Sequence, residues 1–262
     1  MRWHHEQGVD DGVMRHPADS LAWKSFDKLY GAFVVEPHNV RLGLASDGFQ
    51  PFSSLRRPYS IWPVVLIRYN MEPWVCMKPS NFLLLMIIPS LEGPGDTIDV
   101  YLQPLIDELK DLGELGVTAF DASTGENFQL HAALLWTISD LPALGILSRY
   151  STKGNLACPI WNKDTCSIRL ANGGKQCFMG HWCYLPINHQ RRKDKDSFDG
   201  TEEQGLPPMS YSGDDILLQV EDLEGVILTK LAKKRKKILH QNKGDNWKKR
   251  VYSSNFHIGV SF

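Results

Sequence analysis

The sequence predicts an α/β protein with a mixed sheet, on the basis of two observations. Four short segments rich in Val, Ile, Leu and aromatic residues are typical of strands: Val40 to Ala45, Ile61 to Tyr69, Phe82 to Ile88 and Phe128 to Ile138. An amphipathic helix is predicted between the third and the fourth of these segments. The order strand, strand, strand, helix, strand favours a mixed sheet with flanking helices.

The predicted helix spans Thr97 to Leu115. Its apolar residues recur with the helical period on one face: Ile98, Tyr101, Leu102, Leu105, Ile106, Leu109 and Leu112. Pro104 predicts a kink or a late start, because proline has no amide hydrogen to donate. A second helix is predicted from Gly213 to about Lys237, with Ser212 as its cap and Asp215 in the reciprocal position of a capping box.

Charge is distributed unevenly along the 262 residues. The formal net charge is -1, yet residues 230–250 hold ten Lys and Arg residues and a single acid, Asp245. The most concentrated basic run indicates either a nuclear-localisation or phosphate-contacting element or a solvated helix end: Lys233, Lys234, Arg235, Lys236 and Lys237.

Export and membrane insertion are not expected. The N-terminus has no apolar run of the kind that a secretory signal requires. The longest apolar run, Phe82 to Ile88, is far shorter than the ~20 residues that span a bilayer as a helix. Five cysteines, an odd number, do not suggest a disulfide framework. These features predict a reducing nuclear or cytosolic compartment.

Two aspartates follow predicted strands directly. Asp47 comes after the first strand and before a glycine, and Asp140 comes after the fourth strand. If these strands are neighbours, both carboxylates converge and can share Mg²⁺ ions, as two-metal phosphodiester chemistry requires. A turn Asp before Gly is the ordinary alternative for Asp47. Four other acids compete for the same role: Asp96, Asp99, Asp107 and Asp121.

Cysteine and histidine residues gather in a loop-rich segment after the fourth strand. They are Cys158, Cys166, Cys177, His181 and Cys183. Thiolates and imidazole are the ligands that Zn²⁺ prefers, and Cys158, Cys177 and His181 are the candidate set. A structural zinc site usually begins with two cysteines two residues apart, but Trp161 stands at the second position. Free buried thiols are the alternative.

Several long strings closely resemble the transposase family of plant CACTA (En/Spm-type) elements. They are Asp11 to Asp27, Arg41 to Phe52, Tyr59 to Leu66, Asp99 to Leu109, Phe128 to Asp140 and Lys163 to Ser167. The similarity runs in order from about residue 2 to Arg250. Ordered strings of this length are far more specific than any single spacing motif.

The resemblance implies a ribonuclease-H-like core in which three acids hold two divalent cations, Mg²⁺ or Mn²⁺. Such a core cuts DNA at the transposon ends and joins those ends to target DNA. Asp47 resembles the first catalytic acid. Asp140 resembles the second, because it lies 18 residues before Cys158, where related transposases place a Cys-x-x-Cys zinc pair. DNA, and other transposase chains, are the implied partners, in the nucleus.

The family pattern divides the chain into an N-terminal family block (1–38), a partial ribonuclease-H-like core (39–150), a Cys/His-rich segment (151–190), a linker (191–212), a basic helical segment (213–250) and an unrelated tail (251–262). Two departures from the pattern bear on activity. Trp161 replaces a zinc ligand, and the third acid has no counterpart that the resemblance assigns. The expectation is therefore a catalytically incomplete copy, with a non-catalytic DNA-binding or zinc-stapled interaction remnant as the alternative.

Overall fold

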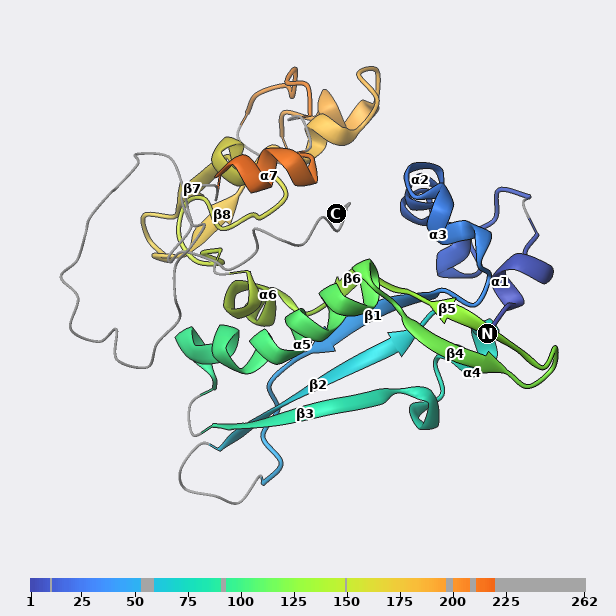
Figure 1. The fold of residues 1–262 in the computed structure, drawn as a ribbon. Coiled ribbons are helices and arrows are strands. Elements are labelled where there is room, and N and C mark those ends of the chain that lie inside the picture. Colours follow the sequence, from blue (N-terminus) through green and yellow to red (C-terminus); the bar gives the residue numbers. More distant parts are fainter. Residues whose placement is uncertain are drawn as a thin grey trace.

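The structure is a computed structural model that describes residues 1–9, 11–52, 59–90, 93–148, 150–196, 200–207 and 211–219. Its centre is a four-stranded sheet in the order β3-β2-β1-β6 (Figure 1). The strands are β1 (Val40–Ser46), β2 (Ser60–Arg68), β3 (Leu83–Ser90) and β6 (Ala132–Ile138). β1 pairs antiparallel with β2 and parallel with β6, and β2 pairs antiparallel with β3. The predicted mixed α/β fold is confirmed.

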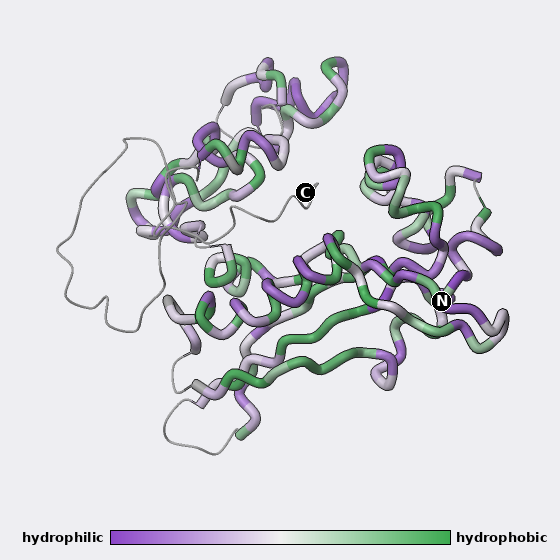
Figure 2. Tube along the Cα trace, viewed as in Figure 1, coloured by the Kyte–Doolittle hydropathy of each residue, from purple (hydrophilic) through white to green (hydrophobic). Residues whose placement is uncertain are grey.

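The helix α5 (Ile98–Glu114) covers one face of this sheet, and a short 3-10 turn η3 (Gly95–Thr97) precedes it. Its apolar stripe is buried against the strands, which are the most hydrophobic part of the molecule in Figure 2. The main core residues here are Val40, Leu42, Trp62, Val64, Leu66, Ile88, Ile98, Leu102, Leu105, Leu109 and Leu134. The helix continues through Pro104, so Pro104 marks no late start.

The N-terminal block packs on the other face of the sheet. It contains α1 (Trp3–Glu6), η1 (Pro17–Asp19), α2 (Leu21–Leu29) and α3 (Gly31–Val35). Trp23 of α2 lies in a second core cluster with Tyr69, Leu135 and others. The buried Arg41 of β1 reaches into this block, where it pairs with Asp27 at 2.6 Å. Arg41 and Trp23 therefore tie the N-terminal helices to the central strand.

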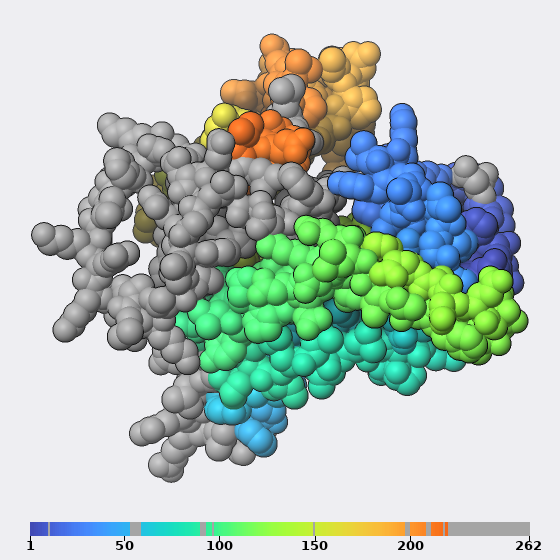
Figure 3. Space-filling model, in the orientation of Figure 1, coloured from blue at the N-terminus to red at the C-terminus, as the bar shows by residue number. Residues whose placement is uncertain are grey.

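The fourth predicted strand is two strands, so that prediction is wrong in its boundaries. β5 (Glu126–Leu130) forms a hairpin with β4 (Val117–Asp121), and β6 begins only after His131. The amide of His131 donates to the side chain of Asn39 at 2.7 Å, and its carbonyl accepts from the amide of Val40 at 2.8 Å. The pairing partner changes from β4 to β1 at this residue. In Figure 3, α5 and the hairpin (green) form a continuous surface.

Shorter elements complete the described chain. α4 (Pro73–Cys76) and η2 (Pro79–Asn81) connect β2 to β3, and α6 (Leu141–Leu147) follows β6. Beyond α6 lie η4 (Asn162–Asp164), β7 (Ser167–Arg169), β8 (Gln176–Phe178), η5 (His181–Tyr184), η6 (Gln190–Arg192) and α7 (Gly213–Gln219), which group together in Figure 1. None of the helices in the described ranges has the length and apolarity that crossing a membrane would require.

The predicted second helix is described only at its start. Ser212 and Asp215 form the predicted reciprocal cap: the amide of Asp215 donates to Ser212 Oγ at 3.1 Å, and the amide of Ser212 donates to Asp215 Oδ2 at 2.8 Å. The part of this prediction that extends to Lys237 lies outside the described residues.

Candidate metal centre

Asp47 and Asp140 lie at the same edge of the sheet. β1 and β6 are parallel neighbours, and their last paired residues are Ala45 and Ile138. Asp47 and Asp140 each follow two residues later, at the carboxyl ends of these strands. Because the carboxyl ends of neighbouring parallel strands lie at the same end of a sheet, the pairing places the two aspartates at adjacent strand ends. The condition that the two strands be neighbours is therefore met.

The backbone around Asp47 is held by β2. Beyond the last ladder pair, Ser46 with Val64, an isolated bridge joins Phe49 to Ile61 through two hydrogen bonds of 3.0 Å. Asp47 is exposed, and its Oδ1 accepts a hydrogen bond from the amide of Gly48 at 2.6 Å. This contact fits the turn role of an Asp before Gly. No hydrogen bond from the described residues reaches the second carboxylate oxygen, which is therefore open to a ligand.

Asp140 has a structural role that the sequence analysis missed. It is the N-cap residue of α6, and its Oδ1 accepts from the amide of Ala143 at 2.7 Å. The signal was present in the sequence, since Asp before Leu141 and Pro142 is a common start of a helix. Asp140 is exposed, and an ionised carboxylate accepts several hydrogen bonds or metal bonds. Capping by Oδ1 and metal binding by Oδ2 are compatible.

The structure separates two of the four competing acids, Asp121 and Asp107, from Asp47 or gives them another partner. Asp121 lies 3.6 Å from His38 Nε2, and His38 precedes β1, so Asp121 is at the amino end of that strand, far from Asp47. Asp107 lies in α5 and accepts from Gln103 at 2.8 Å. Asp99 is in the first turn of α5, which begins after β3 at the same end of the sheet as Asp47, so its position does not separate it from the two aspartates. The side chain of Asp96 is outside the described part of the structure.

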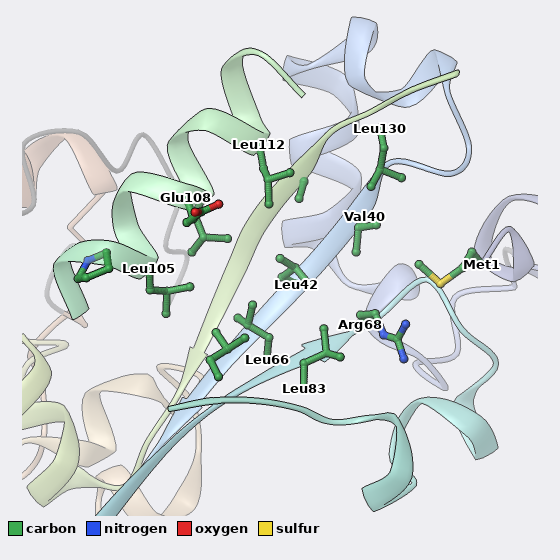
Figure 4. A pocket seen from close by; sticks show the side chains of 14 residues that line it. Met1, Val40, Leu42, Leu66, Arg68, Leu83, Leu105, Glu108, Leu112 and Leu130 are labelled. Carbon is green, nitrogen blue, oxygen red and sulfur yellow. The ribbon is translucent and has the colours of Figure 1, made fainter. Parts of the chain in front are cut away.

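A cavity of about 620 Å³ lies between α5 and the end of the sheet where β1 begins (Figure 4). Its lining is almost wholly apolar: Met1, Val40, Leu42, Leu66, Leu83, Leu85, Pro104, Leu105, Leu109, Leu112, Leu130 and Ala132, with Arg68 and Glu108 as its charged members. Its β1 residues are the first and third of the strand, at the end opposite Asp47. A polar substrate of the acidic edge would therefore not occupy this cavity.

The Cys/His-rich segment is packed around an aromatic ring. Trp161 is 8% exposed and stacks at a tilt on His181 and Tyr184, with ring centroids 5.4 and 5.5 Å apart. Burial raises the pKa of Cys183, which favours a neutral thiol. Among the residues that the structure describes, no three His, Cys, Asp or Glu side chains are grouped to hold a metal ion. Zinc binding by Cys158, Cys177 and His181 therefore stays a prediction.

Arg192 organises the far side of the same segment. It is 2% exposed, in the stretch that the sequence suggested as a linker. Its guanidinium donates to backbone carbonyls of two chain segments. The acceptors are Cys183 and Leu185 at 2.9 Å in one segment, and Glu203 at 3.1 Å and Gly205 at 2.6 Å in the other. Sequence reasoning missed this residue, because Arg192 stands between Arg191 and Lys193, and an arginine in a basic, polar stretch gives no signal of burial.

The basic residues Lys233, Lys234, Arg235, Lys236 and Lys237 lie outside the described residues, and their interpretation stays a prediction. The described chain is thus an α/β protein with a pair of exposed carboxylates at the carboxyl edge of its sheet. Residues 11–223, which include the whole sheet and both aspartates, match the model of the transposase family tnp2. The chain belongs to this transposase family. Searches of curated proteins and of solved structures gave no match.

Proposed function

We propose that this transposase is of the CACTA (En/Spm) type, and that its ancestral activity is metal-dependent cleavage and strand transfer of DNA. Residues 39–150 are proposed to be its ribonuclease-H-like core. The observation that supports the proposal is the placement of Asp47 and Asp140 at adjacent carboxyl ends of parallel strands β1 and β6. Membership of the transposase family supports DNA as the substrate.

The acidic edge fits a hard divalent cation, Mg²⁺ or Mn²⁺. Carboxylate oxygens are the protein ligands of such ions, and Mg²⁺ is usually held by one or two carboxylates, with water and substrate phosphate as its other ligands. Asp47 and Asp140 are both exposed, so the phosphate backbone of DNA can approach them. When bound, the cation would supply Lewis-acid stabilisation of the phosphate charge and activation of a water or 3′-hydroxyl.

The protein's own residues perform the positioning. β1 and β6 fix the backbone of the two aspartates, and the amides of Gly48 and Ala143 each donate a hydrogen bond to one oxygen of a carboxylate. Two carboxylates alone would repel a DNA phosphate, because like charges at close range are unfavourable. DNA binding at this edge should therefore depend on a divalent cation. The basic residues 233–237 are proposed to contact DNA phosphates elsewhere, with an affinity that falls steeply with salt.

Binding of Mn²⁺, followed by electron paramagnetic resonance, tests the site directly. Asp47→Asn and Asp140→Asn should each weaken Mn²⁺ binding about 10-fold or more, because each removes a charged ligand. Asn is as good a helix cap as Asp, so Asp140→Asn separates metal binding from capping. Asp107→Asn, on α5, is the matched control and should leave the affinity unchanged. Equal Mn²⁺ affinity in all four proteins would refute the site.

Nicking of a supercoiled plasmid in Mg²⁺ or Mn²⁺ then separates the two functional alternatives. Nicking that Asp47→Asn abolishes, and Asp107→Asn preserves, supports a catalytically competent site. Mn²⁺ binding without Asp47-dependent nicking supports the alternative, a non-catalytic DNA-binding remnant. The zinc-stapled alternative requires about one equivalent of zinc in the purified protein, which metal analysis measures.

A further inference from the structure

The glycine after Asp47 lies directly on a buried indole ring. The β1–β2 register places Gly48 opposite Trp62, between the Ser46–Val64 pair and the Phe49–Ile61 bridge. A Cβ atom added to Gly48 would overlap the Cε2 and Nε1 atoms of Trp62 and would lie 2.8 Å from Cζ2. The backbone at residue 48 therefore lies so close to the indole that only glycine fits there without a shift.

Trp62 is fixed by its surroundings. It is 5% exposed and belongs to the core cluster between the sheet and α5. An added Cβ at Gly93 would lie 3.6 Å from Nε1, so two glycines border the ring. Within the described part of the chain, the indole N–H has no hydrogen-bond partner. Packing rather than hydrogen bonding therefore holds the ring, and a rigid ring leaves Gly48 little freedom to move toward the core.

Asp47 and Trp62 act from opposite faces of the sheet. Gly48 and Trp62 share the α5 face by their pairing, and the neighbouring residue Asp47 points to the other face. The indole thus touches the backbone beside the aspartate, not its carboxylate. Because Gly48 also donates its amide to Asp47 Oδ1, any shift of Gly48 moves the carboxylate with it.

We propose that Trp62 is a positioning residue for the metal site: its indole lies against the backbone of Gly48 and so fixes the position of the Asp47–Gly48 turn. This inference rests on the proposed function, in which Asp47 holds a divalent cation. Metal sites need ligands held within about 0.5 Å, and residues behind the ligands typically change metal affinity 10- to 100-fold when they are replaced. Trp62 acts on Mn²⁺ affinity through Gly48 alone.

A double-mutant cycle tests this mechanism. Gly48→Ala should weaken Mn²⁺ binding about 10-fold, because the new methyl group pushes the turn away from the indole. Trp62→Phe removes the indole atoms that this methyl group would overlap. The double variant Gly48→Ala/Trp62→Phe should therefore bind Mn²⁺ more tightly than Gly48→Ala alone and come within about 3-fold of Trp62→Phe. Gly31→Ala is the control, since a Cβ at Gly31 meets nothing within 4 Å.

Urea unfolding of each variant shows that the measured proteins are folded, and Trp62→Tyr replaces Trp62→Phe if the latter is not. Rescue of Mn²⁺ affinity in the double variant supports the proposal. Unchanged affinity in Gly48→Ala, or a double variant that binds as weakly as the product of the single effects, overturns it while leaving the metal site intact. Mn²⁺ binding that is absent, or that Asp47→Asn does not affect, instead overturns the proposed function, and this inference with it.

Discussion

Replacing Asp27 with Ala is expected to destabilise the protein, because it leaves a buried cation without its anion. Arg41 is 1% exposed, and its Nη2 donates to Asp27 Oδ1 at 2.6 Å. Its guanidinium also lies 4.5 Å from the ring centre of Trp23 and 5.1 Å from that of Phe33. Removing one partner of a fully buried pair typically costs 3–5 kcal/mol. Asp27 is 29% exposed, and solvent screening reduces the expected cost to about 2 kcal/mol.

Urea unfolding followed by tryptophan fluorescence measures this cost. The double variant Asp27→Ala/Arg41→Met removes both charges and keeps an apolar side chain beside Trp23. It should be more stable than Asp27→Ala alone, because no unpaired charge is left in the core. A cost below about 0.5 kcal/mol for Asp27→Ala, the range of ordinary surface substitutions, would refute the assignment of Arg41 as the anchor of the N-terminal block.

Three further predictions concern pH and packing. Burial lowers the pKa of His4 to about 4, so the folded state favours the neutral ring, and the protein should lose stability as the pH falls from about 6.5 toward 4. After a discount for the partial exposure of the ring, His4→Gln should remove about 1–2 kcal/mol of this loss, which urea unfolding at a series of pH values measures. Gly43→Ala should cost about 1–3 kcal/mol, because its Cβ would lie 2.6 Å from Cε2 of the buried Tyr69, and an unchanged urea midpoint would contradict this packing. Arg192→Lys should cost about 2–3 kcal/mol, because an ammonium group cannot reach carbonyls on both sides as the guanidinium fork does; a thermal melt measures it, and equal stability would show that the carbonyl contacts contribute little.

The periodicity of the apolar residues and the composition of the segments were enough to predict the sheet and the helix that covers it. β1, β2 and β3 and α5 lie where apolar runs and a helical stripe predict them. The hairpin was missed because residues 128–138 form one nearly continuous apolar run. The boundary at His131 depends on its hydrogen bonds with Asn39 and Val40, which are distant in sequence. Local pattern carries no information about such contacts.

The two candidate aspartates could be named from the sequence, but their placement in the sheet could not. Strand ends identify Asp47 and Asp140 as candidates, yet several other acids fit the same pattern. Only the parallel pairing of β1 with β6 places these two at the same end of the sheet, and the contact with His38 places Asp121 at the opposite end. The contacts of Trp62 and Arg41 were not predictable, because a tryptophan or an arginine in a strand reveals neither the glycine nor the aromatic rings beside it.

Anomalous diffraction from crystals soaked in Mn²⁺ tests most directly whether Asp47 and Asp140 coordinate the same cation. The expected result is an anomalous peak within bonding distance of a carboxylate oxygen from each aspartate, absent in crystals of Asp140→Asn. A peak bound by one aspartate alone, or manganese found only at other acids of the chain, would contradict the shared site and leave the edge of the sheet without a metal-dependent role.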